Sequence, residues 1–298
     1  MTEIIVPQPK EDKNGNLEIF PTLGPQVCDF LEERFVYGPG PLRGKPYVVR
    51  DDFRYILYRA YEHYPEGYVI NYDGEEVDYS GRRHFNKVTV SLPKGSAKTE
   101  LMALVSCLEL HPDAPIRFNG YDADAPGGMA PGRSVVSPYI PLLAPTKDQL
   151  DDLAYGAAMT IIQDIEDADL FDVTRERIQV QGEAESRILP VAASAGRLDG
   201  LKPTFQCIDE SHRMFDDRHH KAVQTMENNL TKRMVDDPWQ LVTTTAGDPN
   251  EPSVAKAAYD FGMKIFKGKA KDPRTFFYHR QTSDENAKFD TCLLYTSD

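Results

Sequence analysis

Apolar residues recur along the chain at two spacings, which distinguish predicted helices from predicted strands. Residues 27–35 carry apolar side chains at helical intervals, and residues 53–61 do the same after the turn-rich segment YGPGPLRGKP. These repeats predict two helices ahead of the first core strand. Residues 1–20 are rich in Pro, Lys, Asp and Asn and show little periodicity, which indicates a flexible leader.

Short apolar runs bounded by turn residues predict the strands of a core sheet. They comprise residues 88–90, 139–144, 204–208 and 240–245, with a further hairpin or pair of adjacent strands at 177–193. Helical patterns follow them at residues 99–110, 146–162, 217–234 and 254–266. Thr146 and Gln149 fit a capping box at the start of the second of these helices. Strands that alternate with helices predict an α/β fold with a mainly parallel sheet and flanking helices.

Composition narrows the class of protein. The chain has 298 residues, 40% of them hydrophobic, which is enough to bury a sizeable core. Its formal net charge of -13 is opposite to that of a protein that binds nucleic acid over its whole surface, so we expect any DNA contact to be local. The four cysteines form no C-x-x-C pair, and no stretch approaches the roughly 20 apolar residues of a membrane span.

The segment SLPKGSAKTE, residues 91–100, lies between a predicted strand and a predicted helix, where a phosphate-binding loop occurs. In such loops the backbone N–H groups face the phosphates, a lysine reaches the β and γ oxygens, and a hydroxyl binds Mg²⁺. Lys98 and Thr99 suit the last two roles. The segment departs from G-x-x-x-x-G-K-[ST] because Leu92 and Ala97 replace the two glycines. A lysine that caps a turn at a helix start is the alternative interpretation.

Two adjacent carboxylates follow the predicted strand TFQCI, namely Asp209 and Glu210. An acidic pair at a strand end is how a P-loop ATPase holds Mg²⁺ and orients the attacking water, because phosphoryl transfer depends on positioning and charge neutralisation. Asp209 is then the metal residue and Glu210 the catalytic one. Acidic pairs are also common on surfaces, so the prediction depends on finding both elements in this order.

Two aromatic or basic groups have open interpretations. Arg82, Arg83 and His84 precede the first core strand and either contact phosphate or DNA or form a solvated surface turn. The tyrosines at positions 58, 61 and 64 either pack in the core or form a platform for adenine.

Four ordered strings together resemble the ATPase portion of the large terminase subunit of tailed bacteriophages. They are GRRHFNKVTVSLPKGSAKTEL, PYIPLLAPTKDQLDDLAYGA, RLDGLKPTFQCIDESH and WQLVTTTAGDPNEPS, and the resemblance runs from about Pro21 to about Arg280. It implies a P-loop ATPase core of the ASCE or RecA-like type. It also implies a packaging ATPase domain at residues 21–255, then a closing helix and the start of a linker at residues 256–298, leading to a nuclease domain that is absent from this chain.

The resemblance also implies roles for particular residues. The nucleotide-binding residues are expected to be Lys94, Gly95, Ser96, Ala97, Lys98, Thr99 and Thr244, with Thr99 and Asp209 as Mg²⁺ ligands. Thr243, Thr244 and Thr245 are similar to the family's coupling motif, which senses the γ-phosphate; otherwise they are a β-prone run on a strand. Arg197 resembles an arginine that reaches a neighbouring subunit's nucleotide. Its competitor for that role is Arg187, and the alternative is a surface ion pair with Asp199.

The implied function is an ATP-hydrolysing, Mg²⁺-dependent motor that moves viral DNA into the procapsid. The implied partners are double-stranded viral DNA, the portal protein, the small terminase subunit and further copies of the chain in a ring, without a membrane. The implied location is the cytoplasm of the infected bacterial host, and nuclease activity is not expected from the residues present. Two alternatives are a helicase-like P-loop ATPase and a non-catalytic virion or scaffold protein with a decayed phosphate loop.

Overall fold

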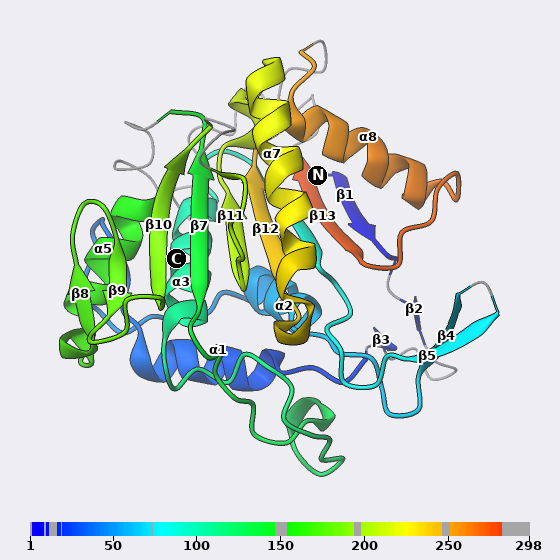
Figure 1. Cartoon of the computed structure of the whole chain (residues 1–298), viewed down its shortest axis with the longest axis horizontal. Helices are drawn as coiled ribbons and strands as arrows, with labels where there is room; N and C mark the ends of the chain where they lie inside the picture. The colour runs from blue at the N-terminus through cyan, green and yellow to red at the C-terminus, as the bar shows by residue number, and fades with distance from the viewer. Residues whose placement is uncertain are drawn as a thin grey trace.

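A single nine-stranded sheet organises the part of the chain that the structure describes. The computed structural model describes residues 2–8, 10–11, 17–18, 20–72, 74–146, 154–193, 198–245 and 251–281. In spatial order, the strands are β1 (Thr2–Val6), β13 (Thr275–Gln281), β6 (Lys87–Ser91), β12 (Trp239–Thr244), β11 (Phe205–Ile208), β7 (Tyr139–Ala144), β10 (Arg187–Ala192), β9 (Ile178–Val180) and β8 (Phe171–Val173). The six strands from β13 to β10 are parallel, and β1, β9 and β8 pair antiparallel at the sides (Figure 1).

Helices cover both faces of this sheet (Figure 1). They are α1 (Gly24–Arg34), α2 (Asp51–Ala60), α3 (Lys98–Leu110), α5 (Ala154–Asp164), α7 (Asp217–Asn229) and α8 (Val254–Phe266). Short 3-10 turns are η1 (Pro126–Gly128), η2 (Ala168–Leu170), η3 (Ser211–Arg213) and η4 (Leu230–Asp236), and two small hairpins pair β2 (Lys10–Glu11) with β3 (Leu17–Glu18) and β4 (Val69–Tyr72) with β5 (Glu75–Asp78). The mainly parallel α/β fold with flanking helices is confirmed. None of the helices in the described ranges has the length and apolar character needed to cross a membrane.

Successive side chains of the central strands point to opposite faces, so each strand serves two cores. Leu142 packs in the large core that includes α1, α2, α3 and α5, whereas its neighbour Leu143 packs with Ile208 and Val242 in a second core that includes α7. Phe277 packs in a third core beneath α8. Fully buried strands read as continuous apolar runs, which is why the sequence pattern identified them.

Several strands lie where the sequence analysis did not expect any, and two of them, β1 and β13, pair with each other in the main sheet. Residues 2–6, assigned to a flexible leader, form β1, which pairs with β13 from Thr2↔Gln281 to Val6↔Phe277. β13 follows the predicted closing helix, so Gln240–Thr245 is not the last strand. The sheet therefore extends beyond residues 21–255 at both ends. Ile4 and Val6 are buried beneath α8, and this contact, made across the whole sequence, orders a segment whose own composition favours a loop.

One predicted helix boundary differs from the structure, and another lies outside the described residues. The helix predicted over residues 217–234 ends at Asn229 and continues as the 3-10 turn η4. Gln149 of the predicted capping box lies outside the described residues, as does the start of that helix, which is described from Ala154.

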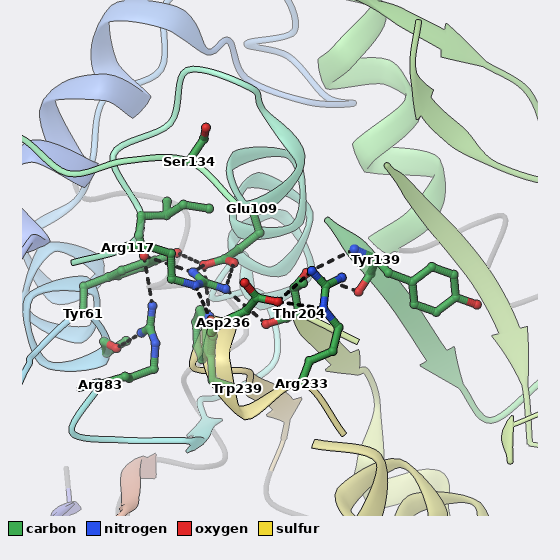
Figure 2. Close-up of polar contacts among 12 residues, drawn as sticks. Tyr61, Arg83, Glu109, Arg117, Ser134, Tyr139, Thr204, Arg233, Asp236 and Trp239 are labelled. Atoms are coloured by element: carbon green, nitrogen blue, oxygen red, sulfur yellow. Dashed lines mark hydrogen bonds and ion pairs between the residues drawn. The ribbon is translucent and has the colours of Figure 1, made fainter. Parts of the chain in front are cut away.

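A buried ion pair holds the edge of the sheet where the parallel strands begin, called here the amino edge (Figure 2). Glu109, in the last turn of α3, lies 2.9 Å from the Arg117 guanidinium, and the two side chains are 0% and 2% exposed. The Tyr61 hydroxyl and Trp239 Nε1 donate to Oε1 of Glu109 at 2.9 and 3.0 Å. Arg117 also donates to the carbonyls of Thr204 and Asp236. Burial removes both charges from water at a cost in free energy, and these additional hydrogen bonds help to offset that cost.

Arg83, considered above for phosphate contact or a solvated turn, takes neither role. It is 0% exposed and donates to the carbonyls of Ala60 and Ile116. Its guanidinium lies 4.7 Å from the ring centroids of both Tyr61 and Trp239, which is cation–π geometry. Burial lowers its pKa to about 10. Nothing in the local pattern around this basic residue indicates that it belongs to the core.

Candidate functional site

Four parallel strands end side by side at the edge opposite the ion pair, called here the carboxyl edge. In the register of the sheet, Ser91 of β6 lies beside Thr244 of β12 and His279 of β13, and Ile208 of β11 lies beside Val242 of β12. The segments that follow β6 and β11 are the predicted phosphate loop and the acidic pair. The two elements, more than 100 residues apart in sequence, therefore meet at one edge, with the end of β12 between them.

The predicted phosphate loop, residues 92–97, turns sharply between β6 and α3. Gly95 has a φ of 84°, and Ala97 has a φ of 55°, the left-handed conformation that glycine adopts without strain. Ala97 thus takes a glycine-like backbone conformation at the second glycine position of the motif, at a cost of about 1–2 kcal/mol for a residue with a Cβ. Lys94 and Gly95 are exposed, and Ser96 is half-buried. The loop is anchored to the sheet by the Leu92 N–H, which donates to the Thr244 carbonyl at 3.1 Å.

Lys98 begins α3 and is only 6% exposed. Its Nζ donates to the carbonyl of Pro93 at 3.1 Å, across the loop. Burial lowers the pKa of Lys98, and the charges of Glu210 and Asp209 partly oppose this effect. The ammonium group therefore interacts electrostatically with both carboxylates, as expected of groups around one shared ligand. Thr99 follows in the first turn of α3 and is half-buried.

Asp209 is 1% exposed at the end of β11. Its Oδ1 accepts the Thr243 hydroxyl at 2.6 Å and the Glu210 N–H at 2.8 Å, while its Oδ2 has no hydrogen-bond partner among the described residues. Burial raises the pKa of this carboxyl to about 6, against the lowering effect of the Thr243 hydrogen bond. A buried carboxylate oxygen without a partner suits a cation ligand.

Glu210 adopts a left-handed backbone conformation with a φ of 53°, which is uncommon for a residue with a side chain. Its Oε2 lies 3.4 Å from both His212 Nε2 and Arg213 Nε, and the Glu210 side chain is 15% exposed. Strained backbone at a strand end is frequent where a side chain must point into a site. The conformation directs the chain from β11 straight into η3.

The three threonines after WQLV occupy different positions. Thr243 is buried and bonds to Asp209, so it lies inside the site. The Thr244 hydroxyl donates to the Thr245 carbonyl at 2.9 Å and accepts the His212 N–H at 3.1 Å. The end of β12 is thus bonded both to the metal-candidate carboxylate and to the turn that carries Glu210.

The two arginines considered for action on a neighbouring subunit's nucleotide have different outcomes. Arg197 lies outside the described residues. Arg187 is the first residue of β10 and pairs with Tyr139, the first residue of β7, so it lies at the amino edge. Its guanidinium lies 5.4 Å from the Tyr139 ring centroid. Arg187 is therefore remote from the phosphate loop of its own chain.

Mg²⁺ prefers oxygen ligands and retains several waters in protein sites. The Asp209 Oδ2 and the Thr99 hydroxyl supply such oxygens at the same edge of the sheet. Within the described ranges no group of three or more His, Cys, Asp or Glu side chains could hold a metal ion. A single carboxylate, a hydroxyl, waters and phosphate oxygens meet the needs of Mg²⁺ without such a group, so the residues present fit this ion.

A cavity of about 300 Å³ beside the phosphate loop was missed by the sequence analysis. It lies between the loop that joins α1 to α2 and the start of α3, and its lining includes Tyr37, Tyr47, Arg50, Phe53 and Glu100. The Arg50 guanidinium lies 4.2 Å from the Phe53 ring centroid, bonds to Asp52 at 2.6 Å and reaches the Ser96 carbonyl at 3.4 Å. The turn-rich string YGPGPLRGKP that precedes Tyr47 was the available signal.

The tyrosines considered as an adenine platform do not line this cavity. Tyr61 is 0% exposed and bonds to Glu109 at the amino edge. Tyr64 is 1% exposed and stacks on Tyr68. Tyr58 packs closely against Gly24 of α1. These residues belong to the core and its rim, as in the alternative interpretation.

Comparison of folds identifies the architecture. The HK97 bacteriophage large terminase aligns with a TM-score of 0.59 and 14% identity over 89% of this chain and 45% of that protein. Two further large terminases align more loosely. One is the large terminase ATPase domain of Thermus phage P74-26 (TM-score 0.38; 15% identity; 66% of this chain, 69% of that one). The other is the large terminase of a thermophilic bacteriophage in complex with ADP (TM-score 0.41; 11% identity; 67% and 43%).

Sequence comparisons add no assignment, because no family model and no curated protein matches the chain. At 14% identity, the HK97 alignment establishes a shared fold. The chain spans less than half the length of that terminase. The chain therefore shares the fold of the HK97 bacteriophage large terminase, with a mainly parallel sheet and helices on both of its faces.

Proposed function

We propose that this chain is the ATP-hydrolysing motor of a phage large terminase, which moves viral DNA into the procapsid. The observation that carries the proposal is that Lys98 follows β6 and the pair Asp209 and Glu210 follows β11, at the same carboxyl edge of one sheet. The HK97 fold supports the same assignment.

Substrate binding begins at the phosphate loop. Backbone N–H groups of residues 94–99 and the amino terminus of α3 attract the triphosphate. Lys98 exchanges its Pro93 carbonyl for the β and γ oxygens, which restores a strong partner to an ammonium group that burial disfavours. The adenosine enters the cavity beside the loop. Its lining includes Tyr37, Tyr47, Phe53 and Arg50, whose flat side chains suit a purine.

Hydrolysis follows at the end of β11. Thr99 and the Oδ2 of Asp209 would hold a Mg²⁺ ion, which would supply charge neutralisation to the phosphates. Glu210 accepts a hydrogen bond from the attacking water and aligns it with the γ-phosphorus. Arg197 of a neighbouring copy supplies a positive charge to the transition state, a contribution on the order of 10³ to 10⁵ in rate for such arginines.

Coupling to movement passes through β12. Thr243 touches Asp209, and Thr244 touches the turn that carries Glu210, so a change at the γ-phosphate alters hydrogen bonds of the strand end itself. The partners we propose are double-stranded viral DNA, the portal protein, the small terminase subunit and further copies of this chain in a ring. The proposed location is the cytoplasm of the infected host.

The test is phosphate release from Mg-ATP by the wild type and by Lys98→Ala and Glu210→Gln. We expect each variant to lose about 10² to 10³ in rate, as removal of one transition-state contact does in other enzymes. Matched controls are Lys87→Ala and Glu227→Gln, which make the same two substitutions away from the site. Lys87 and Glu227 form a partly exposed ion pair with each other, and Lys87 lies at the amino edge. Turnover that is absent from the wild type, or unchanged in both site variants, contradicts the proposal.

A further inference from the structure

Four exposed lysines gather in the last turn of α8 and the short segment that follows it, called here the lysine turn. They are Lys264, Lys267, Lys269 and Lys271, and all four are exposed. None of them makes an ion pair with a described residue, although many other basic side chains in the described ranges do. In a chain with a net charge of -13, this concentration of unpaired positive charge stands apart from the rest of the surface.

The turn is a well-defined structure. Gly268 has a φ of 69°, and the N–H groups of Gly268 and Lys269 donate to the carbonyls of Ile265 and Lys264 at 2.8 and 2.7 Å. This is the way a helix commonly ends at a glycine. On the inner side, Met263 and Ile265 pack against the core that contains Phe277, so Lys264 between them faces outward. The lysines therefore project from a fixed platform.

Nearby acidic residues do not neutralise the lysine turn. Asp260 is paired with Lys256 at 2.6 Å. Asp272 accepts hydrogen bonds from the Arg274 N–H and the Thr275 hydroxyl, at 3.0 and 2.8 Å, so its carboxylate is directed to the start of β13. The positive charge of the turn is left available to a partner outside the chain.

The position of the turn separates it from the nucleotide site. It leads into Thr275, which pairs with Lys87, the first residue of β6, so it lies toward the amino edge of the sheet. α8 lies along β1 and β13 at the side of the sheet, with the turn beyond its end (Figure 1). A ligand held here would lie on the side where β13 begins, whereas a nucleotide held at residues 94–99 would lie at the carboxyl end of β6.

We propose that the lysine turn binds the phosphate backbone of duplex DNA. The flexible lysine side chains can place their ammonium groups against closely spaced backbone phosphates whatever the base sequence. The release of counterions from the DNA supplies the affinity. An acidic surface on a second copy is the competing partner, but lysine is depleted at protein–protein interfaces, whose centres exclude charge. The choice of duplex DNA as the ligand rests on the proposed function. The test below uses no ATP, so its result is independent of ATP hydrolysis.

The experiment measures fluorescence anisotropy of a labelled mixed-sequence duplex with the full chain, without nucleotide, across a salt series. The test variant replaces the four lysines of the turn with alanine. The matched control replaces four other exposed basic residues that form no ion pair with a described residue and lie on separate elements: Lys45, Arg175, Lys202 and Lys221. Both variants lose the same formal charge, and circular dichroism melts check that both fold.

We expect the wild type to bind with an affinity that falls steeply between about 50 and 200 mM salt. The slope of log affinity against log salt should become shallower by up to about 3.6 in the lysine-turn variant, since each of the four phosphate contacts contributes about 0.9. The control should keep the wild-type slope. The proposal is overturned by a wild type that does not bind duplex, by equal losses in both variants, or by a turn variant that loses self-association in sedimentation but keeps duplex binding.

Discussion

The Thr243 hydroxyl donates to Asp209 Oδ1 at 2.6 Å and so joins the ends of two neighbouring parallel strands inside the candidate site. Both side chains are buried. Because Asp209 Oδ1 is occupied by this bond and by the Glu210 N–H, Oδ2 is the oxygen left for a cation. The Thr243 hydroxyl on β12 thereby fixes the orientation of the Asp209 carboxylate, which directly follows β11.

Replacement of this hydroxyl should change how the proposed ATP hydrolysis depends on pH. The Thr243 hydrogen bond lowers the pKa of Asp209 against the effect of burial, so Thr243→Val should raise that pKa above about 6. Since the ionised carboxylate is needed to hold Mg²⁺, the acid limb of the ATP hydrolysis profile should move to higher pH, by up to about one unit. Thr243→Ser keeps the hydroxyl and should keep the profile. If the acid limb of the pH profile does not move in Thr243→Val, the Thr243 hydroxyl does not set the pKa of Asp209.

Asp209 should also reduce stability at neutral pH. Its pKa is raised from 3.8 to about 6, so the folded chain retains a proton that the unfolded chain releases, and stability falls as pH rises through this interval. Asp209→Asn should therefore increase the free energy of unfolding at pH 7 by something on the order of 2 kcal/mol. The gain should disappear near pH 4. Urea unfolding at both pH values, with Glu227→Gln as the control, measures it; a loss of stability at pH 7 contradicts this account.

Ala97→Gly should also stabilise the fold, because Ala97 has a left-handed backbone conformation. Nothing in its φ of 55° favours alanine, and Ala97→Gly removes the Cβ that makes this conformation costly. The glycine loses more entropy on folding, so the net gain should be about 0.5–1 kcal/mol. Thermal unfolding with Ala103→Gly as a control, inside α3, should show the opposite sign, because glycine weakens a helix interior. A destabilised Ala97→Gly chain would mean that the turn is not strained.

The buried ion pair at the amino edge predicts strong non-additivity. Arg117→Met leaves Glu109 buried without its cation and should destabilise the fold by about 3–5 kcal/mol. Glu109→Leu combined with Arg117→Met removes both charges and should lose less than the single arginine variant. Chemical denaturation of the wild type, both single variants and the double variant tests this. A double variant whose loss equals or exceeds the sum of the two single losses refutes it.

The local sequence pattern was sufficient for much of the fold. The central strands at Tyr139–Ala144 and Phe205–Ile208 are buried on both faces, so each is a continuous apolar run that can be recognised without its neighbours. The sequence also placed the predicted phosphate loop and the acidic pair directly after strands, as the structure does. Their convergence then follows from parallel pairing, which brings strand ends to one edge.

Contacts between distant segments could not be predicted in this way. β1 pairs with β13 across nearly the whole chain, and nothing within Thr2–Val6 specifies that partner. Arg83 looked like a surface residue because its burial depends on the rings of Tyr61 and Trp239, which come from other elements. The cavity beside the phosphate loop likewise combines residues from the α1–α2 connection with Glu100, so no single stretch of sequence displays it.

The most direct test of the central claim is a double-mutant cycle on the affinity for Mg-ADP, measured by calorimetry for the wild type, Lys98→Ala, Asp209→Asn and the double variant. If Lys98 and Asp209 serve one nucleotide, each single change should weaken binding, and the double variant should depart from additivity by at least about 1 kcal/mol. Strictly additive losses, or binding that neither change affects, would contradict the assignment of the two residues to one site.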